Sequence, residues 1–395
     1  MGAPVIADTP EWDYTYGGAE YDEVHALIEC SGGGFAIAGV TRSYGMGNQD
    51  GWLVRTDEDG THLWNYSYGG GNTDEFFSLV ECSNGDFALA GTTGSYGVAA
   101  WLLRTDEDGT HLWNYSYEPG MSSGGYVVEC STGGFALLGT NHHGTAEDDL
   151  WLLRTDDSGT PLWNRSYGNP GYESARALVE CSDGGFAFLG VTLVGMHDDA
   201  WLIRTNSTGH HLWNATYGDT ENEMPYDLIE TSGGGFVFTG NYMNQIWLVH
   251  TDASGTVVWE QKYSDESGSM SARSLIECSD GGFAIVGQTD ALEASFYDIL
   301  LTRTDSDGNH LWFKTFGGSE WEDGKALVQV SNGDFIIVSE TDSYGAGLWD
   351  AWLIRTTDTA PTTPTPPIPG FPIEALILGL AVSLGIVIFY RRRRS

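Results

Sequence analysis

The sequence predicts an all-β protein in which seven copies of a four-stranded antiparallel unit close into a ring. A unit of about 50 residues recurs along the chain, which indicates a repeat architecture and not several unrelated domains. Each copy holds four short runs rich in Val, Ile, Leu, Phe, Trp and Tyr, separated by Gly, Asp, Asn and Ser, as expected for strands and tight turns. The last copy lacks its fourth run, and the first residues of the chain supply one.

The strands follow one order in every unit. In the first unit they are predicted at residues 24–29, 35–40, 51–56 and 62–66. No segment before residue 372 shows a helical period over ten or more residues. A Cys-Ser dipeptide or its equivalent marks each repeat at Cys30, Cys82, Cys130, Cys181, Thr231, Cys278 and Val330. Because the ring holds equivalent positions apart, we expect packed thiols and not disulfides.

Ring closure follows from the two ends of the repeat region. Residues 11–18 read like the fourth run of a complete unit, residues 63–70, whereas the seventh unit stops near residue 357 without that run. An N-terminal strand that completes the last sheet leaves no open edge. We therefore predict a seven-bladed β-propeller over residues 11–356, after an N-terminal extension at residues 1–10.

Tryptophans occupy two repeat positions. Large flat side chains at fixed places suit the wedge-shaped gaps between neighbouring blades. The third strand opens with Trp52, Trp101, Trp151, Trp201, Trp247 and Trp352, with Leu300 in the sixth unit. The fourth strand carries Trp12, Trp64, Trp113, Trp163, Trp213, Trp259 and Trp312.

The turn before the fourth strand carries a recurring pattern. In the first unit it reads Asp57-Glu58-Asp59-Gly60, followed by Trp64. This Asp-x-x-Gly-x-x-x-Trp pattern resembles the tryptophan-docking repeats of quinoprotein-type propellers, with one residue fewer. The resemblance implies a related fold, and it does not carry an activity.

The C-terminal region predicts a membrane anchor. A Thr/Pro-rich linker at residues 357–372 should be extended. The mostly apolar residues 373–390 are long enough to cross a bilayer as a helix, and the basic tail at residues 391–395 marks its cytoplasmic end. We expect a single-pass protein of the cell membrane, with the propeller outside and the C-terminus in the cytoplasm.

A short motif in the tail bears on its processing. Pro369-Gly370-Phe371, followed by the apolar and basic residues, resembles the PGF-type sorting segments of archaeal surface proteins. That resemblance implies removal of the tail by a sorting enzyme as an alternative, but permanent anchoring by the helix is the prediction we prefer. The first ten residues show no signal peptide.

The charge balance excludes one class of partner. With 17 Lys and Arg against 55 Asp and Glu, the formal charge of −38 would repel nucleic acid.

Connections between blades, and between the second and third strands, should share one face of the disc. Clustered carboxylates there suit Ca²⁺, and no other cofactor is expected. The candidate metal ligands are Asp148, Asp149, Asp198 and Asp199.

Aromatic residues predict a binding surface on the same face. Ser-Tyr-Gly recurs in three blades that ring closure makes neighbours, and two tryptophans lie outside the repeat positions. Exposed aromatics beside carboxylates suit a sugar or peptide ligand. The candidate ligand-binding residues are Tyr21, Tyr44, Tyr96, Trp321, Tyr344 and Trp349. Sequons at Asn65, Asn114, Asn164, Asn206 and Asn214 are candidates for glycosylation.

These features favour a monomeric, outward-facing binding or adhesion module without catalysis, with a surface glycan or a protein as ligand. No catalytic constellation stands out from the repeats. Two alternatives stay open: an extracellular enzyme, either a quinoprotein-like dehydrogenase or a polysaccharide hydrolase or lyase, and a structural component of a surface coat.

Overall fold

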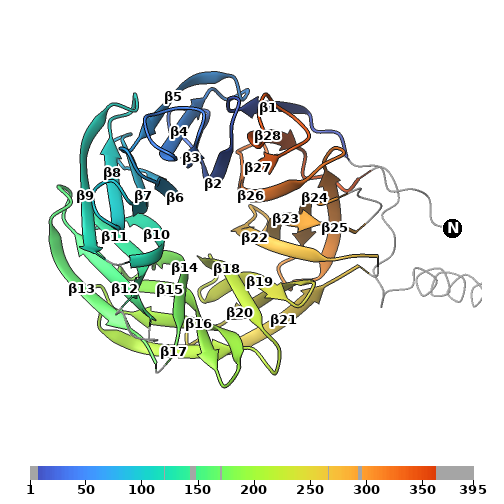
Figure 1. Cartoon of the computed structure of the whole chain (residues 1–395). Helices are drawn as coiled ribbons and strands as arrows, with labels where there is room; N and C mark the ends of the chain where they lie inside the picture. Colours follow the sequence, from blue (N-terminus) through green and yellow to red (C-terminus); the bar gives the residue numbers. More distant parts are fainter. Residues whose placement is uncertain are drawn as a thin grey trace, which may run out of the picture.

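A computed structural model describes residues 8–119, 121–142, 148–169, 171–265, 267–291 and 296–361. In it, seven four-stranded antiparallel sheets stand around a central axis (Figure 1). This confirms the predicted seven-bladed β-propeller. No helix of the described residues is long and apolar enough to cross a membrane. The predicted anchor at residues 373–390 lies outside the described residues, as do the PGF motif and the basic tail.

The strands are ordered from the axis outward within each blade. Blades 1 and 2 comprise β2 (Asp22–Glu29), β3 (Phe35–Thr41), β4 (Asp50–Thr56), β5 (His62–Tyr68), β6 (Asp74–Glu81), β7 (Phe87–Thr93), β8 (Ala99–Thr105) and β9 (His111–Pro119). Blades 3 and 4 comprise β10 (Met121–Glu129), β11 (Phe135–His142), β12 (Asp148–Thr155), β13 (Pro161–Tyr167), β14 (Glu173–Glu180), β15 (Phe186–Val194), β16 (His197–Thr205) and β17 (His211–Tyr217). Blades 5 and 6 comprise β18 (Glu223–Glu230), β19 (Phe236–Tyr242), β20 (Gln245–Thr251), β21 (Val257–Tyr263), β22 (Met270–Glu277), β23 (Phe283–Thr289), β24 (Asp298–Thr304) and β25 (His310–Phe316). Blade 7 comprises β26 (Glu322–Gln329), β27 (Phe335–Thr341), β28 (Asp350–Thr356) and the N-terminal strand β1 (Trp12–Tyr16).

Strand β1 closes the ring. It pairs antiparallel with β28, from Trp12 opposite Arg355 to Tyr16 opposite Ala351. The indole Nε1 of Trp352 donates a hydrogen bond of 2.9 Å to Asp13 Oδ2. The two ends of the propeller are therefore joined by backbone pairing and by side chains, as the sequence predicted.

The core lies between blades. Each hydrophobic cluster draws on two neighbouring blades; one of them joins Ala36 and Leu53 of blade 1 to Phe76 and Trp101 of blade 2. The third-strand tryptophans are the largest side chains of this core, and Trp52, Trp101, Trp151 and Trp247 are at most 2% exposed. Blade-to-blade packing thus supplies the apolar burial that a single four-stranded sheet cannot reach alone.

The fourth-strand tryptophans dock each blade onto the next. Trp64 of blade 1 lies against Phe87 of blade 2, with ring centroids 6.3 Å apart, and the same pair recurs at all seven junctions. The hairpin glycine of the next blade makes room, since a Cβ on Gly109 would meet the Trp64 ring at 2.7 Å. Tyr68 completes the contact by donating a hydrogen bond of 2.6 Å to the Gly109 carbonyl.

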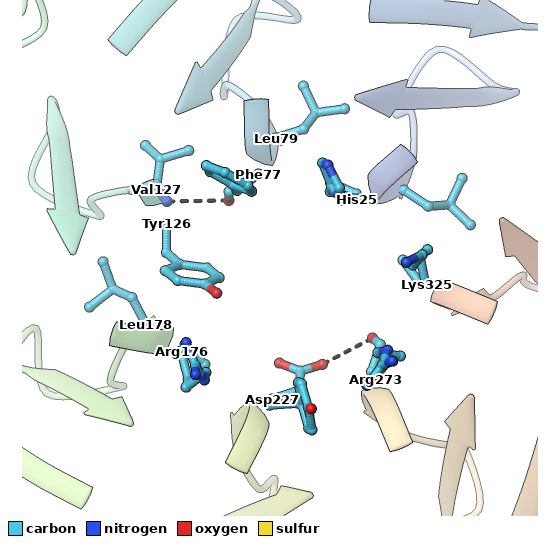
Figure 2. Close-up of a pocket in the computed structure, with 17 residues that line it drawn as sticks. His25, Phe77, Leu79, Tyr126, Val127, Arg176, Leu178, Asp227, Arg273 and Lys325 are labelled. Carbon is cyan, nitrogen blue, oxygen red and sulfur yellow. Dashed lines mark hydrogen bonds between the residues drawn. The ribbon is translucent and has the colours of Figure 1, made fainter. Parts of the chain in front are cut away.

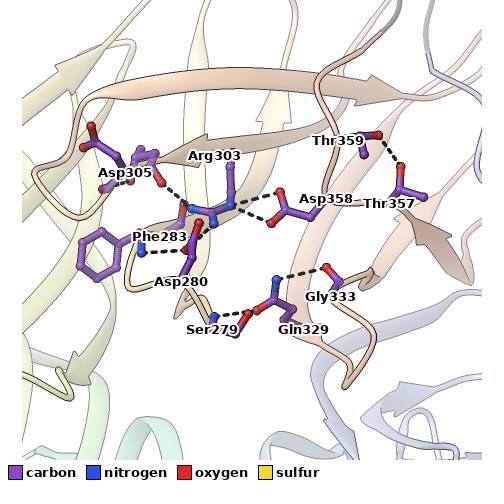
Figure 3. A network of polar contacts seen from close by, with 12 residues as sticks. Ser279, Asp280, Phe283, Arg303, Asp305, Gln329, Gly333, Thr357, Asp358 and Thr359 are labelled. Carbon is purple, nitrogen blue, oxygen red and sulfur yellow. Dashed lines mark hydrogen bonds and ion pairs between the residues drawn. The ribbon is translucent and has the colours of Figure 1, made fainter.

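Polar side chains link the hairpins on the face of the disc opposite to the blade-to-blade connections (Figure 3). Arg303 on β24 binds Asp280 at 2.6 Å and Asp358 at 3.2 Å, joining blade 6 to the segment after β28. Ser279, which follows Cys278, donates its backbone N–H to Gln329 of blade 7 at 2.9 Å. The five cysteines are buried and free, as expected.

Candidate functional site

The innermost strand of most blades carries a β-bulge at one position. In β2 the register shifts between Val24 and Ala26, and the same shift recurs in β6, β14, β18, β22 and β26. A bulge re-aims the side chain of its extra residue. The extra residues are His25, Phe77, Arg176, Tyr226, Arg273 and Lys325. Strand β10 has a larger irregularity between Ser123 and Tyr126.

These bulged residues line a cavity at the centre of the ring (Figure 2). The cavity has a volume of about 370 Å³, a size suited to a small molecule. Its walls come from all seven innermost strands, and Tyr126 fills the place of the side chain that blade 3 lacks there. The cavity combines four basic groups with three aromatic rings and one carboxylate, that of Asp227.

Three of the four basic groups are paired with acids. Lys325 Nζ lies 2.9 Å from Asp323 Oδ2 and 3.0 Å from Glu340 Oε2. Arg273 Nε lies 3.2 Å from the same Asp323 oxygen, and His25 Nε2 lies 3.0 Å from Glu75 Oε1. Burial opposes the charge on Lys325, but Glu340 and Asp323 raise its pKa above the ordinary value. The charges of Lys325 and Arg273 are therefore largely neutralised, and acids hold all three side chains in place.

Arg176 is the exception. It donates hydrogen bonds to Ser174 Oγ at 2.9 Å and to the carbonyl of Ala175 at 3.1 Å, both on its own strand. Its buried Nε has no partner, and no acid of the described residues forms an ion pair with it. The carboxylate of Asp227 is occupied, since it accepts from the backbone N–H groups of Leu228 and Leu275 and from Ser274. Arg176 thus offers an uncompensated positive charge to the cavity.

Aromatic rings complete the cavity. Burial raises the pKa of Tyr126, and the charge of the nearby Arg176 opposes that rise. The guanidinium of Arg273 lies over the Tyr226 ring, 4.9 Å from its centroid. The rings of His25 and Phe77 are 5.4 Å apart. An anionic group at Arg176 would therefore sit beside flat apolar surfaces.

A three-residue cluster adjoins the cavity. Glu23, His25 and Glu75 bring one ligand atom each to within 4.8 Å of one another, and all three are half-buried. In the part of the chain that the structure describes, this is the one group of three or more His, Cys, Asp or Glu so arranged. One imidazole and two carboxylates form a donor set that a divalent metal accepts.

Three of the six predicted aromatic ligand residues meet on the surface. The Trp349 ring lies 4.7 Å from Trp321 and 5.6 Å from Tyr21, measured between centroids. The guanidinium of Arg42 lies over the Tyr21 ring, 5.2 Å from its centroid. This aromatic cluster joins blades 7 and 1.

The tyrosines of the Ser-Tyr-Gly motif serve the fold. Tyr44 donates to the Gly17 carbonyl at 2.7 Å, Tyr96 to Gly69 at 3.3 Å and Tyr344 to Gly317 at 3.0 Å. Each ring also lies against the third-strand tryptophan of its own blade. The three tyrosines are nevertheless 39–48% exposed to solvent. The motif therefore recurs where it holds a connection between blades, a role that accounts for its repetition.

The four predicted metal ligands start two neighbouring third strands. Asp148 and Asp149 lie on β12, and Asp198 and Asp199 on β16. Asp148 and Asp199 are buried, and burial raises the pKa of Asp199. No three-ligand group of the described residues includes any of the four.

The sequon amides differ in their surroundings. Asn65, Asn114 and Asn214 accept hydrogen bonds of 3.1–3.3 Å from third-strand indoles. Asn206 caps its turn by accepting from the N–H groups of Thr208 and His210. Asn164 is exposed on the outer strand β13. Asn164 is thus the sequon whose geometry most favours glycosylation.

The cavity residues were not predicted from the sequence. A signal was present: one repeat position varies among His, Phe, Gly, Arg, Tyr and Lys, while the residues on either side of it are small or apolar in most repeats. Repeats that keep their packing residues and vary one site mark that site as free of packing constraints. Recognising that the site faces the axis required the bulge, which periodicity does not reveal.

Comparison with known proteins supports the fold. No protein-family model matches the chain, and no curated protein matches its sequence. The periplasmic gluconolactonase PpgL of Pseudomonas aeruginosa superposes with a TM-score of 0.55 at 10% identity, covering 83% of this chain and 99% of that one. Sqt1 from Chaetomium thermophilum gives 0.51 at 11% identity, covering 88% and 100%. Its complex with the N-terminus of the ribosomal protein L10 gives 0.51 at 12%, covering 87% and 98%. At these identities the likeness is one of fold alone: the chain is a seven-bladed β-propeller.

Proposed function

We propose that the propeller is a non-catalytic binding module that takes a small carboxylate-bearing ligand in its central cavity. The observation that carries the proposal is Arg176, whose guanidinium lines the cavity without an acidic partner among the described residues. A half-buried cation without a counter-ion is a ready partner for a carboxylate, which it can bind through two parallel hydrogen bonds.

The placement of positive charge supports this function. The chain has only 17 Lys and Arg against 55 Asp and Glu, yet Arg176, Arg273 and Lys325 line one cavity. The strongly negative surface disfavours polyanions such as nucleic acid or polyphosphate. A ligand with a single compact negative charge can pair with Arg176, the cavity cation that no acid of the described residues neutralises, without a large long-range penalty.

The aromatic walls narrow the ligand class. Tyr126 offers a ring and a hydroxyl near Arg176, and Phe77 and Tyr226 add further rings to the cavity walls. Sugar rings present C–H faces that pack on aromatic surfaces, and hydroxyls that form hydrogen bonds with tyrosine. An acidic sugar, free or at the end of a glycan, is the carbohydrate that fits both features.

The cellular setting follows from the tail. The apolar residues 373–390 and the arginines at 391–394 support a membrane-tethered protein with the propeller outside the cell. In that setting the module would bind an acidic glycan or its fragment at the surface. The resemblance of residues 369–371 to archaeal sorting segments supports the same location.

Binding can be tested by calorimetry on the soluble propeller, residues 8–361, after a thermal-shift screen of sugar acids paired with their neutral counterparts. Arg176→Gln should weaken binding of the acidic ligand about ten- to a hundredfold, the cost of losing charge-assisted hydrogen bonds. Arg165→Gln, on the outer strand β13, is the matched control and should bind normally. Equal affinity for acidic and neutral sugars, or no effect of Arg176→Gln, would reject the proposal.

A second candidate function rests on Glu23, His25 and Glu75. If this cluster holds a divalent metal, the cavity beside it could host metal-assisted hydrolysis, in line with an extracellular hydrolase. Turnover of ester or lactone substrates that depends on added Zn²⁺ and is lost in His25→Ala would favour this candidate. If the protein binds Zn²⁺ but turns over none of these substrates, the binding function is favoured over hydrolysis.

A further inference from the structure

A pair of acids recurs where consecutive blades meet. One acid begins the innermost strand of a blade, and the other lies two residues before the third-strand tryptophan position of the preceding blade. Five junctions carry both acids: Asp50 with Asp74, Asp149 with Glu173, Asp199 with Glu223, Asp298 with Glu322, and Asp350 with Asp22. All ten side chains except Asp149 are less than 9% exposed.

The two acids are present together or absent together. At the junction of blades 5 and 6 the equivalent residues are Gln245 and Met270. At the junction of blades 2 and 3 they are Ala99 and Met121, as the strand registers show. No junction keeps a single acid of the pair. The two acids therefore recur as one unit of the junction.

A glycine accompanies every acid pair. The residue after the last aromatic residue of the outer strand is Gly17, Gly69, Gly168, Gly218 or Gly317 at the five acidic junctions. At the other two it is Glu118 and Ser264. A Cβ on Gly17 would meet Asp350 Oδ1 at 1.8 Å and Asp22 Oδ2 at 2.9 Å, and one on Gly317 would meet Asp298 Oδ1 at 2.1 Å and Glu322 Oε2 at 2.8 Å. Both acids of a pair thus converge on one backbone cradle.

Several of these oxygens have no partner. Asp350 uses Oδ2 to accept from the N–H groups of Ala346 and Gly347, at 2.6 and 3.0 Å, and leaves Oδ1 unpaired. Asp298 Oδ1 and Asp199 Oδ1 are buried and unpaired as well. Buried polar atoms without partners are rare in folded proteins, and each calls for a water, a proton or an ion as its partner.

Two carboxylates held side by side repel each other while both are ionised, and a proton or a cation between them relieves that repulsion. Lys262 is the basic residue nearest Glu223, and its ammonium group is engaged by Glu260 at 3.4 Å and Asp219 at 3.9 Å. No Lys, Arg or His of the described residues forms an ion pair with either acid at the blade 6–7 or blade 7–1 junction.

We infer that these junctions bind divalent cations of the calcium type, held between the paired carboxylates at the glycine cradle. Hard oxygen donors from two carboxylates suit Ca²⁺, which completes its coordination with backbone carbonyls and water. Bound cations would cross-link neighbouring blades and offset part of the −38 formal charge of the chain. Asp149 and Asp199, which the sequence singled out, belong to two different junctions, each with a glutamate as its partner.

The inference is tested by counting bound Ca²⁺ on the propeller after chelator treatment, by equilibrium dialysis with elemental analysis. The double variant Asp298→Asn/Glu322→Gln should lose one Ca²⁺ per chain. The double variant Glu58→Gln/Asp59→Asn removes the same charge from an exposed turn and should lose none. No Ca²⁺ bound to the wild-type protein, or an unchanged count in the junction variant, would overturn the inference.

A gain-of-site variant keeps the test independent of lost stability. Ser264→Gly/Gln245→Asp/Met270→Glu installs the glycine and both acids at the blade 5–6 junction and should add one Ca²⁺ per chain. The thermal melts of Asp298→Asn/Glu322→Gln add a second readout. This variant should be more stable than the wild type in chelator, because the repulsion is gone, and less stable in saturating Ca²⁺. A higher stability than the wild type in both buffers would show that Ca²⁺ does not bind the wild-type pair and would overturn the inference.

Discussion

At the residue scale, the hairpin glycines decide how one blade fits the next. Gly109 has a φ of +80°, a backbone conformation that glycine adopts without strain. It also lies where a Cβ would meet Trp64 and Tyr66, both at 2.7 Å. The recurring Asp-x-x-Gly-x-x-x-Trp pattern therefore has one structural role: the tryptophan ring of each blade packs against the turn glycine of the next blade.

The glycine role predicts a stability difference between two alanine variants. Gly109→Ala should destabilise the propeller by about 2–4 kcal/mol, because it adds a clash with the Trp64 ring to the backbone strain. Gly184→Ala has a similar φ of +78° with no atom within 4 Å of the added Cβ, and should cost only about 1 kcal/mol. Urea unfolding of both variants measures the difference. Equal losses would show that backbone strain alone matters.

At the element scale, strand β1 shows how a segment of five residues can hold a ring. Its backbone completes the blade 7 sheet. Its Trp12 packs on Phe35 of blade 1, with centroids 6.4 Å apart, and its Tyr16 hydroxyl donates to the Gly60 carbonyl. The strand thus binds blade 7 through its backbone and blade 1 through its side chains, so that closure and docking depend on the same segment.

Removal of residues 1–17 should lower the melting temperature sharply, because it exposes the edge of β28 and removes the Trp12 contact, worth about 3 kcal/mol. A synthetic peptide covering residues 8–18 should restore much of the loss by pairing with β28. A scrambled peptide is the control. A truncated protein that melts like the full chain would contradict the role assigned to β1.

The same scale shows what the sequence could predict. Strand positions followed from turn residues and apolar runs, and β2 to β5 match the predicted segments to within two residues at each end. Ring closure could be predicted from the displaced Trp12 segment. The bulges could not be predicted, because one extra residue in a strand leaves the apolar pattern nearly unchanged. That residue nevertheless turns His25 or Arg176 toward the axis. The acid pairs were missed for a related reason: Asp298 and Glu322 come together only through blade packing.

At the scale of the whole molecule, charge is distributed unevenly. The propeller places buried acid pairs at five blade junctions and gathers scarce cations around its axis. Asp323, 1% exposed, links the two regions because it follows Glu322 in β26 and pairs with Lys325 and Arg273. The blade 6–7 junction and the central cavity therefore share strand β26.

The acid pairs give stability a defined dependence on pH. The pKa of Glu223 rises from 4.5 to about 7 in the folded state, so its contribution is fully present below about pH 4.5 and is lost as the pH rises through 7. In chelator, Glu223→Gln should therefore match the wild type near pH 4 and exceed its melting temperature above pH 7. Saturating Ca²⁺ should remove this advantage by stabilising the wild type alone. Melting curves from pH 4 to 8 in both buffers measure the effect, and a variant no more stable than the wild type at pH 8 in chelator would show that Glu223 carries no repulsive charge.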